Sequence, residues 1–194
     1  MRIGAGPGGT CVNVGCVPKK LMYVAASVRE HMVGSAEIAS GYGFEASVDL
    51  LKAMRCNWEV LKERRDAYVA HLNNVYHKSW ASLGVDVRTG TAHVKSVGKV
   101  HTVEVTEENG NVLTLTADKL VVAVGGVPDV PDVPGKELAI TSDGFFDLAT
   151  QPKKCAVFGA GYIAVEMAGI LNALGTETTL FCRGDKVLRN EEVQ

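Results

Sequence analysis

The sequence predicts an α/β protein, and three of its patterns carry this prediction. Residues 153–183 read as strand, glycine turn, helix and strand, which is typical of a unit of a nucleotide-binding fold. Residues 16–33 and 49–82 place apolar side chains at helical spacing. Residues 85–116 switch to a period of two, as short strands do. A chain of 194 residues with this alternation suits one large domain or parts of two.

Composition and charge exclude several classes of protein. Hydrophobic residues make up 46% of the chain, which is enough for a core, and charged residues make up 22%. The net charge of -2 leaves no broad basic surface for nucleic acid. No apolar run has the roughly 18 residues of a membrane span, and the first residues, MRIGAGPGG, lack the apolar stretch of a secretory signal. We therefore expect a soluble, cytosolic protein, with a mitochondrial form left open.

The helical patterns have boundaries that the sequence suggests. Pro18 lies near the start of the first pattern, where proline is tolerated. Residues 1–10 read as a glycine-rich loop, and residues 34–48 read as a second loop between the two helices. The charged cluster at 62–66 in the second pattern is interpreted as a solvated helix face.

The strand patterns include one strong turn signal. Residues 108–111, Glu-Asn-Gly-Asn, separate two alternating runs and predict a hairpin, because Asn-Gly suits a turn that needs positive φ. Residues 119–124 read as a buried, valine-rich strand that runs into a glycine turn. Residues 127–136 are rich in proline and are interpreted as a connection between domains.

A G-x-G-x-x-A motif lies between the strand and the helix of the 153–183 unit. Gly159 permits a tight turn, Gly161 lets the backbone approach a pyrophosphate, and Ala164 allows close packing of helix on strand. The helix that follows, predicted over 162–174 and stopped by Gly175, offers free N–H groups to an anion. The alternative interpretation is an ordinary βαβ turn that binds no nucleotide.

The residues after the second strand of this unit favour NADPH over NADH. An NAD site has an acidic residue at the end of that strand, whereas here Arg183 follows it, with Lys186 and Arg189 beyond. Guanidinium groups suit a 2′-phosphate. Asp185 is the contrary feature, and the alternative is that these basic residues belong to a solvated surface.

Two of the five cysteines, Cys11 and Cys16, lie close together in sequence. A zinc site would need about four ligands, and a structural disulfide is disfavoured in a reducing compartment. A helix that begins near Cys16 and the positive charge of Lys19 and Lys20 would favour a reactive thiolate. Spacing alone therefore predicts a reactive pair. The other three are interpreted as buried small hydrophobic side chains: Cys56, Cys155 and Cys182.

The segment GGTCVNVGCVPKK resembles the redox-active segment of the flavin-linked disulfide reductases, the class I pyridine nucleotide-disulfide oxidoreductases. The stretches RDAYVAHLNNVY, TSDGFF, GAGYIAVEMAGILNALG and RGDKVLR most resemble the glutathione reductases of that family, with trypanothione and thioredoxin reductases as the alternative relatives. The resemblance covers nearly the whole chain. It implies a partial FAD-binding domain with a β-meander at 1–136 and a partial NADPH-binding Rossmann domain at 137–194.

The resemblance also implies a path of electrons from NADPH through FAD to a Cys11–Cys16 disulfide and then to glutathione disulfide. Cys11 would be the thiol that attacks glutathione disulfide, and Cys16 would lie against the flavin as a thiolate. Lys19 would sit near the reactive edge of the flavin, paired with Glu166 on the helix of the NADPH domain. Tyr76 would line the glutathione site.

The family's cofactor contacts transfer to matching positions. Thr10 and Lys19 would contact FAD, and so would Ala123 and Gly125, although Val124 stands where the family has threonine. Tyr162 would cover the nicotinamide pocket and move when NADPH enters. The remaining NADPH contacts would be Gly159, Gly161, Ile163, Glu166, Arg183 and Arg189.

The sequence departs from the family near its start. Gly4, Gly6 and Gly9 have the spacing of the FAD fingerprint, but only residues 1–3 precede them and the cysteine segment follows at once. The family places a helix, a strand and an acidic residue between these parts. Glu30 lies within an expected helix and is not accepted as that acid. We therefore expect an incomplete FAD site and an internally deleted chain.

A second departure is at the end of the sequence, which stops at Gln194 before the family's dimerisation domain. In this homodimeric family that domain carries a catalytic His–Glu pair. None of the five histidines stands in a matching motif: His31, His71, His77, His93 and His101. Three functions remain as hypotheses, namely a glutathione-disulfide reductase, an NADP-binding fragment without turnover, and a non-functional partial product.

Overall fold

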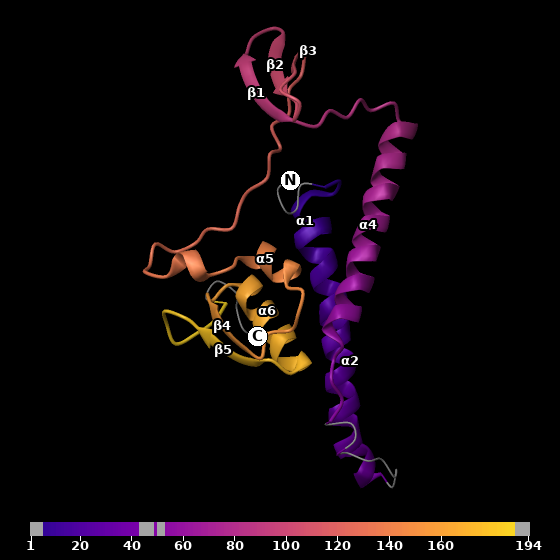
Figure 1. Cartoon of the computed structure of the whole chain (residues 1–194), viewed down its shortest axis with the longest axis vertical. Coiled ribbons are helices and arrows are strands. Elements are labelled where there is room, and N and C mark those ends of the chain that lie inside the picture. The colour runs from indigo at the N-terminus through magenta and orange to yellow at the C-terminus, as the bar shows by residue number, and fades with distance from the viewer. Residues whose placement is uncertain (1–5, 43–48, 50–52, 189–194) are drawn as a thin grey trace. The chain divides into compact units, whose positions relative to one another are not determined.

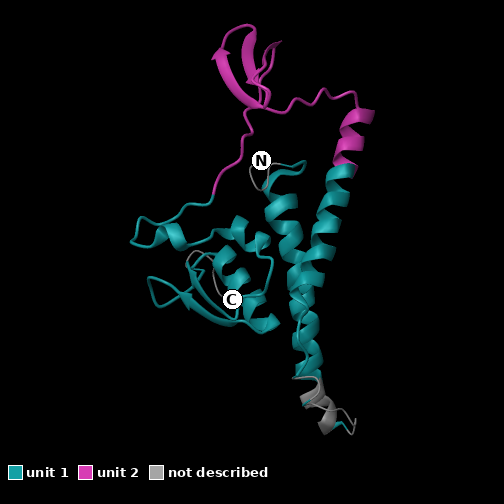
Figure 2. Cartoon of the chain, viewed as in Figure 1, with its two compact units in different colours: residues 1–74, 128–194 teal, residues 75–127 magenta. Residues whose placement is uncertain are grey.

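The computed structural model describes residues 6–42, 49 and 53–188 (Figure 1). The chain divides into two compact units, which are described separately. Unit 1 combines residues 1–74 and 128–194, and unit 2 is residues 75–127 (Figure 2). The proposed domain boundary after residue 136 divides the chain differently and stays a prediction. None of the described helices has both the length and the apolar character of a membrane span.

The C-terminal part of unit 1 is a strand–helix–strand element. Strands β4 (Lys154–Phe158) and β5 (Glu177–Phe181) are parallel, with Lys154 opposite Glu177 and Phe158 opposite Phe181. Helix α6 (Tyr162–Leu174) connects them and packs on both strands. It ends at Gly175, whose φ of 105° is one that glycine adopts readily. The predicted strand, helix and stop of this unit are therefore confirmed.

The N-terminal part of unit 1 consists of two helices joined at one glycine. Helix α1 (Gly9–Val14) is followed by Gly15 and then by the long helix α2 (Cys16–Gly41). A helix was predicted only as far as residue 33, with a loop from 34, so this boundary was wrong. One glycine inside a helix costs about 1 kcal/mol. The helical turns on both sides of Gly34 offset this cost, so the helix continues through it.

Helix α4 (Trp58–Ser82) begins in unit 1, nine residues later than the predicted start at 49. The Asn57 side chain accepts a hydrogen bond from the Val60 N–H at 3.1 Å, which is the geometry of an N-cap. Asn57 therefore sets the start of the helix at Trp58. Residues 54–57 have no regular secondary structure, and residues 50–52 lie outside the described residues.

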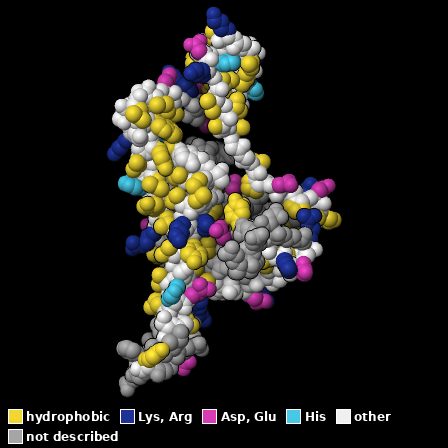
Figure 3. All heavy atoms as spheres, turned by 180° about the vertical axis from the view of Figure 1, so that it is seen from behind, with side chains coloured by type: hydrophobic (Ala, Val, Ile, Leu, Met, Phe, Trp, Pro, Cys, Tyr) yellow, Lys and Arg dark blue, Asp and Glu magenta, His cyan; other side chains and the backbone are white. Residues whose placement is uncertain are grey.

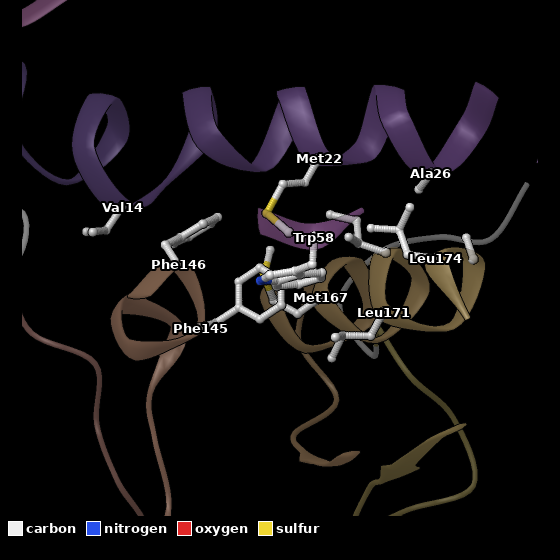
Figure 4. Close-up of a cluster of buried hydrophobic side chains, with 11 residues drawn as sticks. Val14, Met22, Ala26, Trp58, Phe145, Phe146, Met167, Leu171 and Leu174 are labelled. Carbon is white, nitrogen blue, oxygen red and sulfur yellow. The ribbon is translucent and has the colours of Figure 1, made fainter. Parts of the chain in front are cut away.

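One hydrophobic core holds these elements together (Figure 4). It lies where α2 packs on α6, beside the start of α4 and the short helix α5 (Ser142–Asp147). Each fully buried aliphatic side chain here contributes about 1.5–3 kcal/mol. Its buried members are Val14, Met22, Ala26, Trp58, Phe145, Phe146, Met167, Ile170, Leu171, Ala173 and Leu174.

A buried arginine fastens α4 to this core. Arg65 is 3% exposed, and its guanidinium donates to the Phe146 carbonyl and to the Asp66 carboxylate. It also contacts the Met22 sulfur at 3.3 Å and lies 5.6 Å from the centre of the Phe146 ring. Because a buried charge is stable only when it is paired, these contacts hold α2, α4 and α5 in one arrangement.

Hydrophobic side chains are also exposed along the helical part of unit 1 (Figure 3). On α2 the exposed apolar residues include Val24 and Val28, and on α4 they include Val60 and Tyr68. These side chains do not belong to the buried core.

Unit 2 contains a three-stranded antiparallel sheet, as predicted for residues 85–116. Its strands are β1 (Thr91–Ser96), β2 (His101–Thr106) and β3 (Val112–Ala117), in that order. The turn at Asn109-Gly110 joins β2 to β3, and Gly110 has a φ of 82°. The Glu107 N–H donates to the Asn111 carbonyl at 2.9 Å, which closes the hairpin.

The valine-rich run at 119–124 is not a buried strand, which corrects the prediction. Val121 and Val124 are each 85% exposed, and this segment has no strand partner among the described residues. A strand that is apolar on both faces is stable only between neighbouring strands and covering layers. The composition of the run is that of a buried strand, but among the described residues no neighbouring strand pairs with it.

Candidate dithiol and dinucleotide sites

The two cysteines of the predicted dithiol lie on either side of Gly15. Cys11 is in α1, Cys16 is the first residue of α2, and both side chains are exposed. A Cβ atom at Gly15 would lie 2.8 Å from the Thr10 carbonyl oxygen and 3.0 Å from the Cys11 Cα atom. Only glycine therefore lets the two helices approach this closely, and this junction brings the two thiols together.

The two thiols interact directly. A side-chain hydrogen bond with Cys16 raises the pKa of the Cys11 thiol above its usual value, and partial burial adds to the effect. The sequence predicted a reactive pair with a thiolate at the start of the helix near Cys16, from the helix N-terminus and the nearby lysines, and this stays a prediction. The side-chain hydrogen bond raises the pKa because it favours the protonated form of Cys11, and it outweighs a backbone hydrogen bond with Cys16 that acts in the opposite direction.

An ion pair connects the dithiol helix to the nucleotide-motif helix. Lys19 Nζ on α2 lies 2.7 Å from Glu166 Oε1 on α6, across 147 residues of sequence. Both side chains remain partly exposed, at 26% and 37%. The pairing implied by the resemblance is thus present as a contact, while the catalytic role of the two residues stays a prediction.

The glycine turn between β4 and α6 has the geometry that its motif requires. Gly159 has a φ of 147°, and a Cβ atom there would lie 3.0 Å from the Ala164 Cβ atom. Gly161 precedes α6 and faces open space, with no atom within 4 Å of a Cβ built at this position. The first N–H groups of α6 are thus available to an anion that approaches past Gly161.

A cavity of about 1190 Å³ opens at this turn. Gly159, Gly161, Tyr162 and Arg183 line it, together with the proline-rich segment that includes Lys136. Ile163 is in the first turn of α6 and is partly exposed. The cavity combines a helix N-terminus with an arginine, which is an arrangement suited to a phosphorylated dinucleotide.

The residues described here fit NADPH in three respects. Gly161 leaves room for a pyrophosphate, α6 directs its N-terminus at that space, and Arg183 offers a guanidinium in the same cavity. Arg189, the other predicted phosphate contact, lies outside the described residues.

The glycine loop near the N-terminus is filled by the chain's own side chains. Asn13 donates to the carbonyls of Gly6, Pro7 and Gly9, and Asn73 donates to the Pro7 carbonyl at 2.7 Å. A Cβ at Gly6 would lie 2.7 Å from Asn13 Oδ1. A flavin pyrophosphate that approached Gly6 on this side would meet the side chains of Asn13 and Asn73. Gly4 lies outside the described residues.

The two asparagines were not predicted as site residues. Asn13 stands between the two cysteines, and this position was the only signal in the sequence. Asn73 is separated from Pro7 by 66 residues, so nothing in the sequence pattern connects them.

The remaining predicted site residues are placed as follows. Thr10 follows Gly9 in α1 and is exposed. Tyr76 is in the part of α4 that belongs to unit 2. Ala123 and Gly125 also belong to unit 2, in the segment after β3. The structure thus brings together the dithiol, Lys19 and Glu166 within unit 1.

The other cysteines differ from one another. Cys56 and Cys155 are half-buried against the core, and burial raises the pKa of each thiol. Cys182 is exposed and lines the large cavity, so its predicted burial was wrong. It follows β5 directly, where the alternation of the strand no longer determines burial. Among the described residues, no three His, Cys, Asp or Glu side chains gather closely enough to hold a metal ion.

Comparison with known proteins gives a family match over nearly the whole chain. The model of the pyridine nucleotide-disulphide oxidoreductase family matches residues 2–194. A glutathione reductase of Yarrowia lipolytica is 47% identical over 184 residues, which cover 94% of this chain and 38% of that protein. A glutathione reductase of Debaryomyces hansenii is 42% identical over 200 residues, with 94% and 39% covered. The chain therefore spans less than two fifths of the length of these curated relatives.

Proposed function

The chain belongs to the pyridine nucleotide-disulphide oxidoreductase family, and from this premise we propose that it takes part in the NADPH-dependent reduction of glutathione disulfide. FAD and NADPH are the cofactors of the glutathione reductases in this family. The observation that carries the proposal is the pairing of Cys11 with Cys16 across Gly15, together with the ion pair that joins Lys19, on the helix that Cys16 begins, to Glu166.

NADPH would be held at the glycine turn of unit 1. The pyrophosphate would lie at Gly161 and the first turn of α6, and Arg183 would bind the 2′-phosphate. Tyr162 and Ile163, in the first turn of α6, would flank the nicotinamide half. Bound NADPH supplies the hydride of the overall reaction.

The dithiol can reduce a disulfide with its own two sulfur atoms. The Cys11 thiolate attacks one sulfur of glutathione disulfide, the S–S bond breaks, and the first glutathione thiolate leaves and takes up a proton. Cys16 then attacks the Cys11 sulfur of the mixed disulfide and releases the second glutathione. Two electrons pass from the dithiol to glutathione, and a Cys11–Cys16 disulfide remains.

The hydrogen bond between the thiols determines what the first step requires. Because this bond raises the pKa of Cys11, the thiol must lose its proton before it attacks. A base or a rise in pH should therefore accelerate the reaction of Cys11 with glutathione disulfide.

The proposal is tested by following the absorbance of NADPH with the purified chain, glutathione disulfide and added FAD. Cys11→Ser and Cys16→Ser should each abolish oxidation of NADPH, while Cys56→Ala, a half-buried thiol outside the dithiol, should retain it. Equal rates in all four proteins, after subtraction of the reaction without protein, would contradict a role for the dithiol.

The filled glycine loop favours a second candidate, namely NADPH binding without turnover. A flavin pyrophosphate that approached Gly6 on its Cβ side would meet Asn13 and Asn73. A chain that binds NADPH, remains colourless with added FAD, and oxidises no NADPH would support this candidate. In both candidates Arg183→Gln should weaken NADPH about tenfold and leave NADH affinity nearly unchanged, because only NADPH carries the 2′-phosphate.

A further inference from the structure

We propose that the stacked rings of Phe158 and Phe181 form a platform on which the adenine ring of the dinucleotide stacks. The inference deepens the proposed nucleotide function and rests on it. It assigns a ligand contact to two residues that stand outside the glycine motif and outside the arginine site.

The two rings lie against each other at the ends of the two parallel strands. Phe158 and Phe181 are opposite each other in the register of β4 and β5. Their ring centres are 4.9 Å apart and their planes differ by 12°, so the rings are stacked. In this parallel arrangement, the ring face of Phe158 that points away from Phe181 is a flat aromatic surface.

The platform is open on the side away from α6. Along β4, Cys155 and Val157 point toward the helix and the core, while Ala156 and Phe158 are on the exposed face. Phe158 is 74% exposed and Phe181 is 48% exposed. Isolated exposed apolar residues are common on protein surfaces, but a stacked aromatic pair that lines a cavity of this size is a surface for a planar ligand.

The position of the platform selects the adenine half of the dinucleotide. The Gly159 N–H donates to the Phe181 carbonyl at 2.9 Å, so the end of β5 adjoins the glycine turn. Arg183 follows Phe181 by two residues, and Phe158, Phe181 and Arg183 line the same cavity. The 2′-phosphate that Arg183 would bind is on the adenosine ribose. The base attached to that ribose is therefore the ring nearest to Phe158 and Phe181.

Stacking of a base on an aromatic side chain depends on the flat π-surface and tolerates exchange between aromatic residues. An aliphatic side chain of similar size would keep the apolar surface and lose the stacking. This difference separates an adenine platform from an apolar pair that is merely uncovered.

The test uses adenosine 2′,5′-bisphosphate, which has the adenine and the 2′-phosphate and lacks the nicotinamide. Its affinity for the full chain is measured by calorimetry. Phe158→Leu should weaken binding about tenfold, within the range of alanine substitutions at stacked bases, and Phe158→Tyr should stay within about twofold of the parent. The matched control is Tyr68→Leu, an exposed aromatic residue of α4 that does not line the cavity.

A second variant gives a direct signal. With Phe158→Trp, the probe should quench the new indole fluorescence and shift the adenine absorbance, whereas inorganic phosphate should do neither. The cooperative thermal transition of each variant shows that it remains folded.

The outcomes separate the platform from the nucleotide site itself. If Arg183→Gln weakens the probe while Phe158→Leu binds like the parent, the platform is wrong and the nucleotide site stands. If Phe158→Tyr weakens binding as much as Phe158→Leu does, the proposed stacking of adenine on Phe158 is wrong. If the unmodified chain binds neither the probe nor NADPH, the proposed function fails and the platform fails with it.

Discussion

Gly15→Ala tests whether the close junction of α1 and α2 holds the two thiols together. The added methyl group would lie 2.8 Å from the Thr10 carbonyl oxygen and 3.0 Å from the Cys11 Cα atom. Both obstacles are backbone atoms, so no flexible side chain can move aside. The junction must open by several tenths of an ångström to reach ordinary van der Waals contact.

Two consequences can be measured. Overpacking of this kind costs about 1–3 kcal/mol, which chemical denaturation should detect as a lower free energy of unfolding. Opening the junction also lengthens the hydrogen bond between the thiols. The pKa of Cys11 should therefore fall toward its usual value, and the rate at which iodoacetamide alkylates Cys11 should rise at neutral pH.

The matched control is Gly34→Ala, inside helix α2. No atom lies within 4 Å of a Cβ built at Gly34, so alanine meets no obstacle there. This variant should gain about 0.5–1 kcal/mol because alanine favours the helix over glycine, and the pKa of Cys11 should not change. If Gly15→Ala unfolds like the parent and its Cys11 alkylation profile is unchanged, the close approach at Gly15 does not position the thiols.

Three further predictions follow from the described contacts. Cys16→Ala should lower the pKa of Cys11, which is measured from alkylation rates against pH, and an unchanged profile would contradict the thiol hydrogen bond. In the parent, the raised pKa of Cys11 contributes stability that is complete below the pKa of the unfolded state. This stability is lost as pH rises through the pKa of the folded state. A double-mutant cycle of Lys19→Met and Glu166→Gln should give a coupling energy of about 0.5–1 kcal/mol in denaturation, because the pair is partly exposed, and a coupling near zero would show that the contact contributes nothing. Arg65→Ala should lose about 3 kcal/mol of unfolding free energy, because it leaves the Phe146 carbonyl unpaired and opens a cavity. Its control is Arg64→Ala, at an exposed neighbour, which should lose less than about 0.5 kcal/mol. Equal losses in the two variants would refute the role of burial.

The strand–helix–strand element β4–α6–β5 could be predicted from sequence almost residue by residue. Its helix begins at Tyr162 and ends at Leu174 as predicted, because the glycines at 159, 161 and 175 mark its turn and its stop. The same holds for the β2–β3 hairpin at Asn109-Gly110. In both cases the signal is local, since a few neighbouring residues determine the backbone conformation.

The errors arose where distant residues decide the outcome. The run at 119–124 has the composition of a buried strand, but its burial depends on neighbours that its own residues do not reveal. The dithiol shows a related limit. Its sequence spacing predicted a reactive pair, which stays a prediction, while the raised pKa of Cys11 comes from a contact with Cys16 that spacing alone does not reveal. The contact of Asn73 with Pro7 likewise had no sequence signal.

The arrangement of unit 1 places a thiol pair and a glycine motif that are far apart in sequence at the starts of two packed helices. Cys16 begins α2, and Gly161 directly precedes α6, so each chemical group lies at the N-terminal end of one of these two helices. Met22 and Ala26 of α2 share a core with Ile170 and Leu171 of α6, farther along both helices. The Lys19–Glu166 pair lies closer to the two functional ends. Because the core fixes the helices to each other and the ion pair adds a contact near their starts, the spacing between the thiols and the glycine turn depends on helix packing more than on any loop. Among the described residues, the elements most needed for the proposed chemistry are therefore also those that stabilise the unit.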